Sequence, residues 1–126
     1  IAAAVRALPG KLALLAISGT ELEVEGRKAG LEVVAEVFAD RAYRADGRLV
    51  PRGQAGAVLH DPEAVAARLV RFAETGQMPV LGGGEVALAA RSVCVHGDTP
   101  GAVALARGLR DRLEAAGLAI RPFAGG

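Results

Sequence analysis

The chain has 126 residues, of which 52% are apolar, and 15 basic residues nearly balance 14 acidic ones. Because the basic residues are scattered along the chain, neither a nucleic-acid-binding stripe nor a membrane-binding patch is predicted. The longest apolar run, Leu12–Ile17, is far shorter than the roughly 20 residues that span a bilayer, and no signal-peptide pattern precedes it. We therefore expect one globular unit, residues 1–126, in the cytoplasm.

The first part of the chain alternates predicted helices and strands. Ile1–Leu8 is rich in alanine and compatible with a helix, and Leu12–Ile17 is typical of a strand buried on both faces. Thr20–Ala29 opens with a Thr-x-x-Glu capping box and predicts a short helix that Gly30 ends. Leu31–Val37 is enriched in β-branched residues and predicts a second strand.

Residues 38–56 form a turn-rich, arginine-rich segment that has neither a helical nor a strand period. The segment predicts a long loop. Loops of about 15 or more residues are uncommon in compact domains and are usually functional. This loop is therefore the first place to look for a site.

Two further helices are predicted in the second half. The first begins at Asp61-Pro62-Glu63, with a side-chain cap and a proline in its first turn, and ends at Gly76. The second is capped by Asp98 or Thr99 and ends at Gly117.

Short strands are predicted at Met78–Leu81, Arg91–Val95 and Leu118–Ile120, and residues 123–126 are expected to form a loose tail. Residues 82–84 are three glycines without the Lys-Ser/Thr of a phosphate-binding loop, so we interpret them as a turn. Strands that alternate with helices predict a parallel sheet with helices packed outside it, which is the α/β class.

In parallel α/β folds, ligands bind beyond the carboxyl ends of the strands. Two groups of polar residues occupy such positions: Glu36, Asp40, Arg41 and Tyr43 after the second predicted strand, and His96 with Asp98 after the Arg91–Val95 strand.

Each group also has a purely structural interpretation. Asp40 and Arg41 are equally typical of an ion pair that fixes a loop, and Asp98 is typical of a helix cap. His96 precedes a glycine and then a carboxylate able to orient its ring, which favours an acid/base or metal-ligand site. His60 is expected on the surface, and Cys94, inside an apolar strand, is expected to be a buried thiol rather than a nucleophile.

Two long motifs resemble the LamB/YcsF family, the A subunits of bacterial ATP-dependent 5-oxoprolinases. They are EVFADRAYRADGRLVPRG, which begins at residue 36, and VHGDTP, which begins at residue 95. Family members are about twice as long, and their N-terminal half carries acidic, His-rich and Lys-Pro-His-Gly motifs that this sequence lacks. The chain therefore resembles the C-terminal half of such a domain. The resemblance implies part of a distorted (β/α) barrel of the glycoside hydrolase/deacetylase type.

The activity implied by the resemblance is opening of the lactam of 5-oxo-L-proline to L-glutamate, coupled to ATP hydrolysis. ATP is then a co-substrate, a divalent metal such as Mg²⁺ accompanies it, and two partners, the B and C subunits, are required. A homo-oligomer is compatible with this arrangement. Nothing in the 126 residues resembles a nucleotide-binding motif.

The resemblance also suggests roles for individual residues. His96, oriented by Asp98, would transfer protons or bind a metal. Glu36 would act with them, or would hold a metal or an arginine. Asp40, Arg41, Tyr43 and Arg52 would bind the substrate, the two arginines through its carboxylate or a phosphorylated lactam oxygen. Two alternatives remain open at this point: a metal-dependent deacetylase or carbohydrate-active enzyme, and a non-catalytic assembly subunit.

Overall fold

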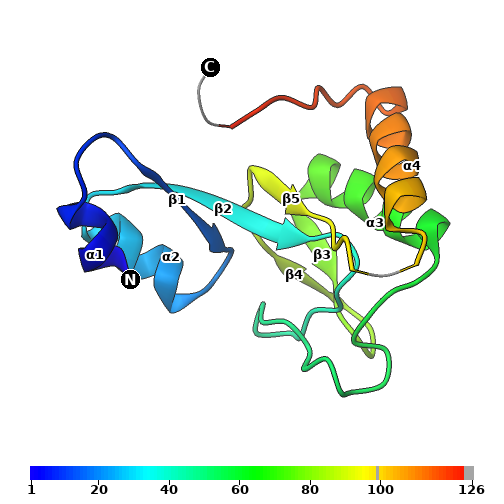
Figure 1. The fold of residues 1–126 in the computed structure, drawn as a ribbon. Coiled ribbons are helices and arrows are strands. Elements are labelled where there is room, and N and C mark those ends of the chain that lie inside the picture. The colour runs from blue at the N-terminus through cyan, green and yellow to red at the C-terminus, as the bar shows by residue number, and fades with distance from the viewer. Residues whose placement is uncertain (99, 124–126) are drawn as a thin grey trace.

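The computed structural model describes residues 1–98 and 100–123 of the chain. Figure 1 shows the helices and strands that these residues form. In chain order they are α1 (Ala2–Ala7), β1 (Ala13–Ile17), α2 (Glu21–Lys28), β2 (Glu32–Phe38), α3 (Pro62–Thr75), β3 (Gln77–Pro79), β4 (Glu85–Ala87), β5 (Ser92–Cys94) and α4 (Ala102–Ala115). In the described part of the chain, no helix combines the length and the apolar character needed to cross a membrane.

The main sheet confirms the predicted α/β class with parallel strands and outer helices. Its order is β1-β2-β5, and both neighbouring pairs are parallel. In Figure 1, β2 runs across the molecule from the end that carries α1 and α2 to the end that carries α3 and α4. Backbone hydrogen bonds continue past the strands, from Ser18 N–H to the Glu36 carbonyl (2.8 Å) and from Ala39 N–H to the Cys94 carbonyl (2.9 Å). The carboxyl ends of β2 and β5 therefore meet at one edge, and β1 ends two residues earlier, opposite Glu36.

A separate antiparallel hairpin, β3-β4, stands beside this sheet. Residues 82–84 form its turn, as predicted, and all three glycines have positive φ angles. Strand β4 was not predicted from the sequence, because three residues are too few to show a strand period.

Two predicted helix starts need correction, and one is confirmed. The capping box at Thr20 does not form: the Thr20 hydroxyl donates to the Ile17 carbonyl (2.6 Å), and Glu23 accepts from Gly19 N–H (2.8 Å). Asp98 is not the cap of α4, because that helix begins after Gly101, and Thr99 lies outside the described residues. At α3 the prediction is confirmed, since Asp61 accepts from Glu63 N–H (3.0 Å) and Gly76 ends the helix.

The predicted closing strand at 118–120 is also wrong, and the end of α4 explains why. Gly117, with a φ of 83°, allows Leu118 N–H to donate to the Leu113 carbonyl (3.0 Å). This is the terminal hydrogen bond of a Schellman motif, so the backbone at residue 118 completes the helix end instead of joining a sheet. Residues 118–120 have no regular structure, and residues 124–126 of the expected tail lie outside the described part.

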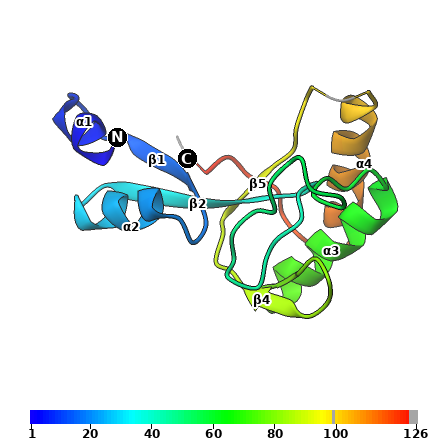
Figure 2. The same ribbon diagram turned by 90° about the horizontal axis from the view of Figure 1, so that it is seen from below.

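The core lies between the sheet and the helices. Two clusters pack α3 against the carboxyl half of the sheet and the segment that follows it. The first comprises Ala39, Val65, Ala66, Leu69 and Leu109. The second comprises Val37, Tyr43, Phe72 and Met78. Figure 2 shows α4 beside α3, with α1 and α2 together at the opposite end. β1 is not buried on both faces as predicted, because its exposure alternates and Leu15 remains 41% exposed. The sheet therefore presents one partly uncovered face.

Candidate active site

His96 and Asp40 lie together at the carboxyl edge of the sheet. Each follows its strand by two residues, His96 after β5 and Asp40 after β2. The Nδ1 atom of His96 is 2.7 Å and 2.8 Å from the two carboxylate oxygens of Asp40. The sequence prediction that Asp98 orients His96 is therefore wrong. The carboxylate that touches the imidazole is the one 56 residues away.

Two contacts fix the His96 ring. An ionised carboxylate can only accept hydrogen bonds, so contact with Asp40 places the proton of a neutral imidazole on Nδ1 and leaves Nε2 as its basic atom. The ring also stacks on Phe38, with centroids 5.1 Å apart and an angle of 26° between the planes. With side-chain exposures of 17% for His96 and 5% for Asp40, the pair is shielded but still reachable from solvent.

Glu36 shares a face of the sheet with these groups. In the parallel register, Glu36 is paired with Ser92 and Phe38 with Cys94, so these four side chains lie on the same side. Burial raises the pKa of Glu36, and the nearby His96 charge acts in the opposite direction. Glu36 is thus a half-buried carboxyl group on the His96 side of the sheet.

Cys94 is half-buried rather than fully buried, and its surroundings keep the thiol protonated. Burial raises its pKa, and the charges of Glu36 and Asp40 raise it further. A thiol of this kind is a poor nucleophile. Across residues 1–98 and 100–123, no group of three or more His, Cys, Asp and Glu side chains is arranged to hold a metal ion. This part of the chain therefore offers no complete metal-ligand set of its own.

Arg41 and Tyr43 are buried and point into the protein. The Arg41 guanidinium donates to the carbonyls of Val50 (2.6 Å) and Ala57 (3.3 Å) across the long loop. Tyr43 is fully buried, and its hydroxyl accepts from Phe38 N–H at 2.9 Å. Burial is the main cause of the raised pKa of Tyr43. These two side chains hold the predicted loop against the end of β2.

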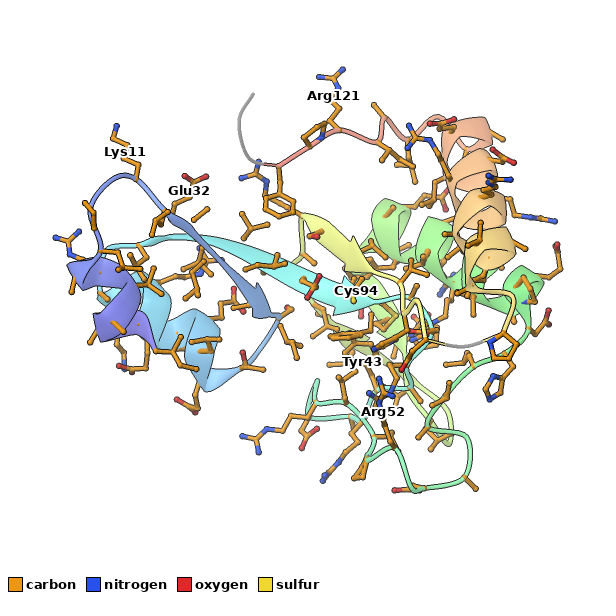
Figure 3. All side chains as sticks on the ribbon, in the orientation of Figure 1. Lys11, Glu32, Tyr43, Arg52, Cys94 and Arg121 are labelled. Atoms are coloured by element: carbon orange, nitrogen blue, oxygen red, sulfur yellow. The ribbon has the colours of Figure 1, made fainter. Side chains whose placement is uncertain are left out.

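Arg52 and Asp98 are exposed at the rim of the same edge. Arg52 Nη1 is 4.0 Å from Asp98 Oδ2, and both side chains are more than half exposed. Figure 3 shows Arg52, Tyr43 and Cys94 near the carboxyl ends of β2 and β5, whereas Lys11 and Glu32 lie toward the opposite end of β2. The Arg52 charge is therefore only loosely held and is accessible to an anion.

Arg68, a buried arginine of α3, was not among the predicted site residues. Its Nη1 donates to the carbonyls of Ala39 (3.3 Å) and Arg41 (2.8 Å), which are the residues on either side of Asp40. One signal was available in the sequence. Arg68 lies three residues after Val65 and four before Phe72, so it interrupts the apolar face of its helix.

The fold and this pair define an α/β domain with a histidine–carboxylate site at the carboxyl edge of parallel strands. The LamB/YcsF family model matches residues 1–126, and the chain belongs to this family. It is 52% identical over 123 residues to the A subunit of 5-oxoprolinase from Mycobacterium avium, covering 98% of this chain and 49% of that protein. The A subunit from Rhodopseudomonas palustris strain BisB18 is 48% identical over 126 residues, which are 100% of this chain and 49% of that protein.

A solved structure shares the fold. The crystal structure of the lactam utilization protein from Thermus thermophilus has a TM-score of 0.89 and 44% sequence identity, over 97% of this chain and 48% of that one. The chain spans about half the length of the curated relatives it matches.

Proposed function

We propose that this chain is part of the A subunit of an ATP-dependent 5-oxoprolinase, a cytoplasmic enzyme that opens the lactam of 5-oxo-L-proline to L-glutamate with B and C subunits as partners. Relatives at about half identity carry the name of the 5-oxoprolinase A subunit, which supports the proposal. The parallel strands and outer helices suit part of a distorted (β/α) barrel. The observation that carries the proposal is the His96–Asp40 contact at the carboxyl edge of the sheet.

The chemistry of lactam opening explains why such a pair is useful. An unstrained five-membered lactam is a poor electrophile, and phosphorylation of its oxygen by ATP creates a leaving group. Attack of water on the activated carbon forms a tetrahedral intermediate and requires one proton to leave the water. Breakage of the bond between this carbon and the ring nitrogen then requires one proton to reach the nitrogen and leaves an acyl phosphate, which a second water hydrolyses to L-glutamate and phosphate. The basic Nε2 of His96 takes the first proton, and the resulting imidazolium donates it to the nitrogen. Asp40 stabilises this imidazolium through Nδ1.

The remaining site residues take different roles in this proposal. Arg52, exposed at the rim, binds the substrate carboxylate or the phosphorylated oxygen, because a guanidinium pairs with either anion in a bidentate fork. Asp98 orients Arg52 toward this edge. Arg41 and Tyr43 shape the loop instead of touching substrate, because their polar atoms already bind the backbone. Glu36 faces the His96 side and polarises the attacking water.

The experiment measures lactam-dependent ATP hydrolysis by the assembled enzyme, which contains the full-length A subunit and both partner subunits. His96→Ala should lower kcat by about 10²–10⁴-fold, the range for loss of a general acid–base group. His60→Ala is the matched control, because His60 is exposed and lies outside the site, and it should retain wild-type turnover.

The outcome separates the proposal from its alternatives. Circular dichroism should show the same fold for both histidine variants. Wild-type turnover in His96→Ala would contradict the catalytic role and favour a non-catalytic assembly subunit. Hydrolysis of an acetylated sugar without ATP or partner subunits would instead favour the deacetylase alternative.

A further inference from the structure

Arg68 is a buried cation that the proposed chemistry does not use directly. Its side chain lies on α3, and its relative exposure is only 7%. Burial lowers the pKa of its guanidinium, while the charges of Tyr43 and Asp40 act in the opposite direction. Its Nε atom is buried without a hydrogen-bond partner among the described residues. Burying a charged group costs free energy unless hydrogen bonds compensate for the lost water. The hydrogen bonds that Arg68 does make therefore indicate its role.

Those contacts converge on the backbone around Asp40. Nη1 donates to the carbonyls of Ala39 and Arg41, at 3.3 Å and 2.8 Å, and the carbonyl of Asp40 itself accepts from Leu59 N–H at 2.9 Å. Three successive carbonyls are therefore held by two other parts of the chain. The backbone that carries the Asp40 side chain is fixed on both sides.

Further contacts fix Arg68 in its turn. Its Nη2 donates to the sulfur of Met78 (2.9 Å), and the centre of the guanidinium lies 5.9 Å from the centroid of the Tyr43 ring. Both partners are fully buried. Helix α3, strand β3 and the long loop are thus joined at one side chain.

We propose that Arg68 is a positioning residue: by binding the carbonyls on either side of Asp40, it holds the Asp40 carboxylate against Nδ1 of His96 and so fixes the ring and its tautomer. This inference rests on the proposed function for its catalytic consequence. Its structural consequence, the state of the His96 ring, can be measured without any activity.

The first test compares Arg68→Lys and Arg68→Met in the assembled enzyme. A lysine keeps the charge and one donor nitrogen, but it lacks the planar guanidinium whose second nitrogen binds Met78 and which faces the Tyr43 ring, whereas methionine removes every hydrogen bond. We expect kcat for lactam-dependent ATP hydrolysis to fall about 10–100-fold in Arg68→Met, the range for loss of a group that orients a site residue. Arg68→Lys should partly restore kcat, and KM should change little in either variant. Equal kcat in wild type and both variants, together with an unchanged His96 tautomer in the second test, would overturn the inference.

A matched variant separates positioning from general destabilisation. Leu14→Ala removes a buried side chain from the cluster at the far end of the sheet and should reduce stability without changing kcat below its melting temperature. If Leu14→Ala lowers kcat as much as Arg68→Lys does at equal loss of stability, Arg68 has no specific role.

A second test is independent of activity. Nitrogen-15 NMR of histidine-labelled protein, at a pH above the ordinary histidine pKa, reports whether the His96 proton lies on Nδ1. We expect the Nδ1–H tautomer in wild type and a mixture of tautomers in Arg68→Lys, which also serves if Arg68→Met does not fold. An unchanged tautomer would overturn the inference. A changed tautomer with full turnover would instead overturn the proposed function of His96 and leave the positioning of its ring intact.

Discussion

At the amino end of the sheet, α1 and α2 pack on β1 and β2 through apolar side chains such as Leu14, Ala16 and Val33. The ion pairs there, Arg27 with Glu23 and Lys28 with Glu25, lie on the surface. At the carboxyl end the chemistry is different, because polar groups enter the interior. Within the described part of the chain, the buried polar and charged residues are Ser18, Asp40, Arg41 and Arg68. All four lie at or against the carboxyl ends of the parallel strands.

The contrast between the two ends shows where the fold buries charged groups despite the free-energy cost of desolvation. Apolar contacts suffice to join strands and helices, as the amino end shows, so buried charge is not needed for assembly alone. At the carboxyl end, the buried arginines bind carbonyls of the loop that carries Asp40. We infer that polar burial at this end serves to fix the site.

The largest expected change in stability comes from removing a buried arginine at the carboxyl end, compared with an exposed arginine at the amino end. Arg41→Ala leaves the carbonyls of Val50 and Ala57 without their charged donor, and should lower the free energy of unfolding by about 3 kcal/mol. Arg27→Ala removes an exposed i,i+4 ion pair and should cost less than about 0.5 kcal/mol. Urea denaturation of both variants measures the contrast. Equal losses would show that the loop does not depend on its buried arginine.

A smaller effect concerns the pH dependence of stability and has opposite signs for two glutamates. Burial raises the pKa of Glu36 above its ordinary value of 4.5, so its contribution to stability is fully present below that pH and is lost as the pH rises through the folded-state pKa. Glu36→Gln should therefore be slightly more stable than wild type at neutral pH, and the difference should vanish in acid.

Glu85 is the matched control for this prediction. Its hydrogen bond with Arg71 lowers its pKa, so its contribution is present at neutral pH and is lost as the pH falls. Glu85→Gln should be slightly less stable than wild type at neutral pH. Melting temperatures across the acid range test both variants, and the same sign for both would contradict the comparison.

Local signals in the sequence predicted the elements whose ends are chemically marked. Helix α3 carries Asp61, a proline and Gly76 at the expected positions, and β2 is enriched in valine. The same signals placed Asp40 and His96 after strands, where sites occur. The short β4 was not predictable in this way, because its pairing with β3 forms only in the folded chain. The strand predicted at residues 118–120 was wrong although the end of α4 is marked by Gly117, because the Schellman hydrogen bond uses the backbone of Leu118.

The partner of His96 shows most clearly what sequence spacing cannot give. Asp98 is two residues from His96, but its exposed side chain lies toward Arg52. Asp40 is distant in sequence, yet the β2–β5 pairing brings it to the imidazole. The residues at the edge of the sheet could be predicted from the sequence, but their pairing depends on strand order and register. Arg68 depends on a third element, α3, and was missed for the same reason.

The proposed chemistry requires that Asp40, and not Asp98, supports His96, and a comparison of Asp40→Asn with Asp98→Asn in the assembled enzyme tests this requirement. Lactam-dependent ATP hydrolysis is measured for both variants, with circular dichroism to check the fold. We expect Asp40→Asn to lower kcat about 100-fold, because an amide no longer stabilises the imidazolium. The kcat of Asp98→Asn should stay within a few-fold of wild type, and any effect of this variant should appear in KM. A large loss of kcat in Asp98→Asn together with normal turnover in Asp40→Asn would contradict the assignment of Asp40.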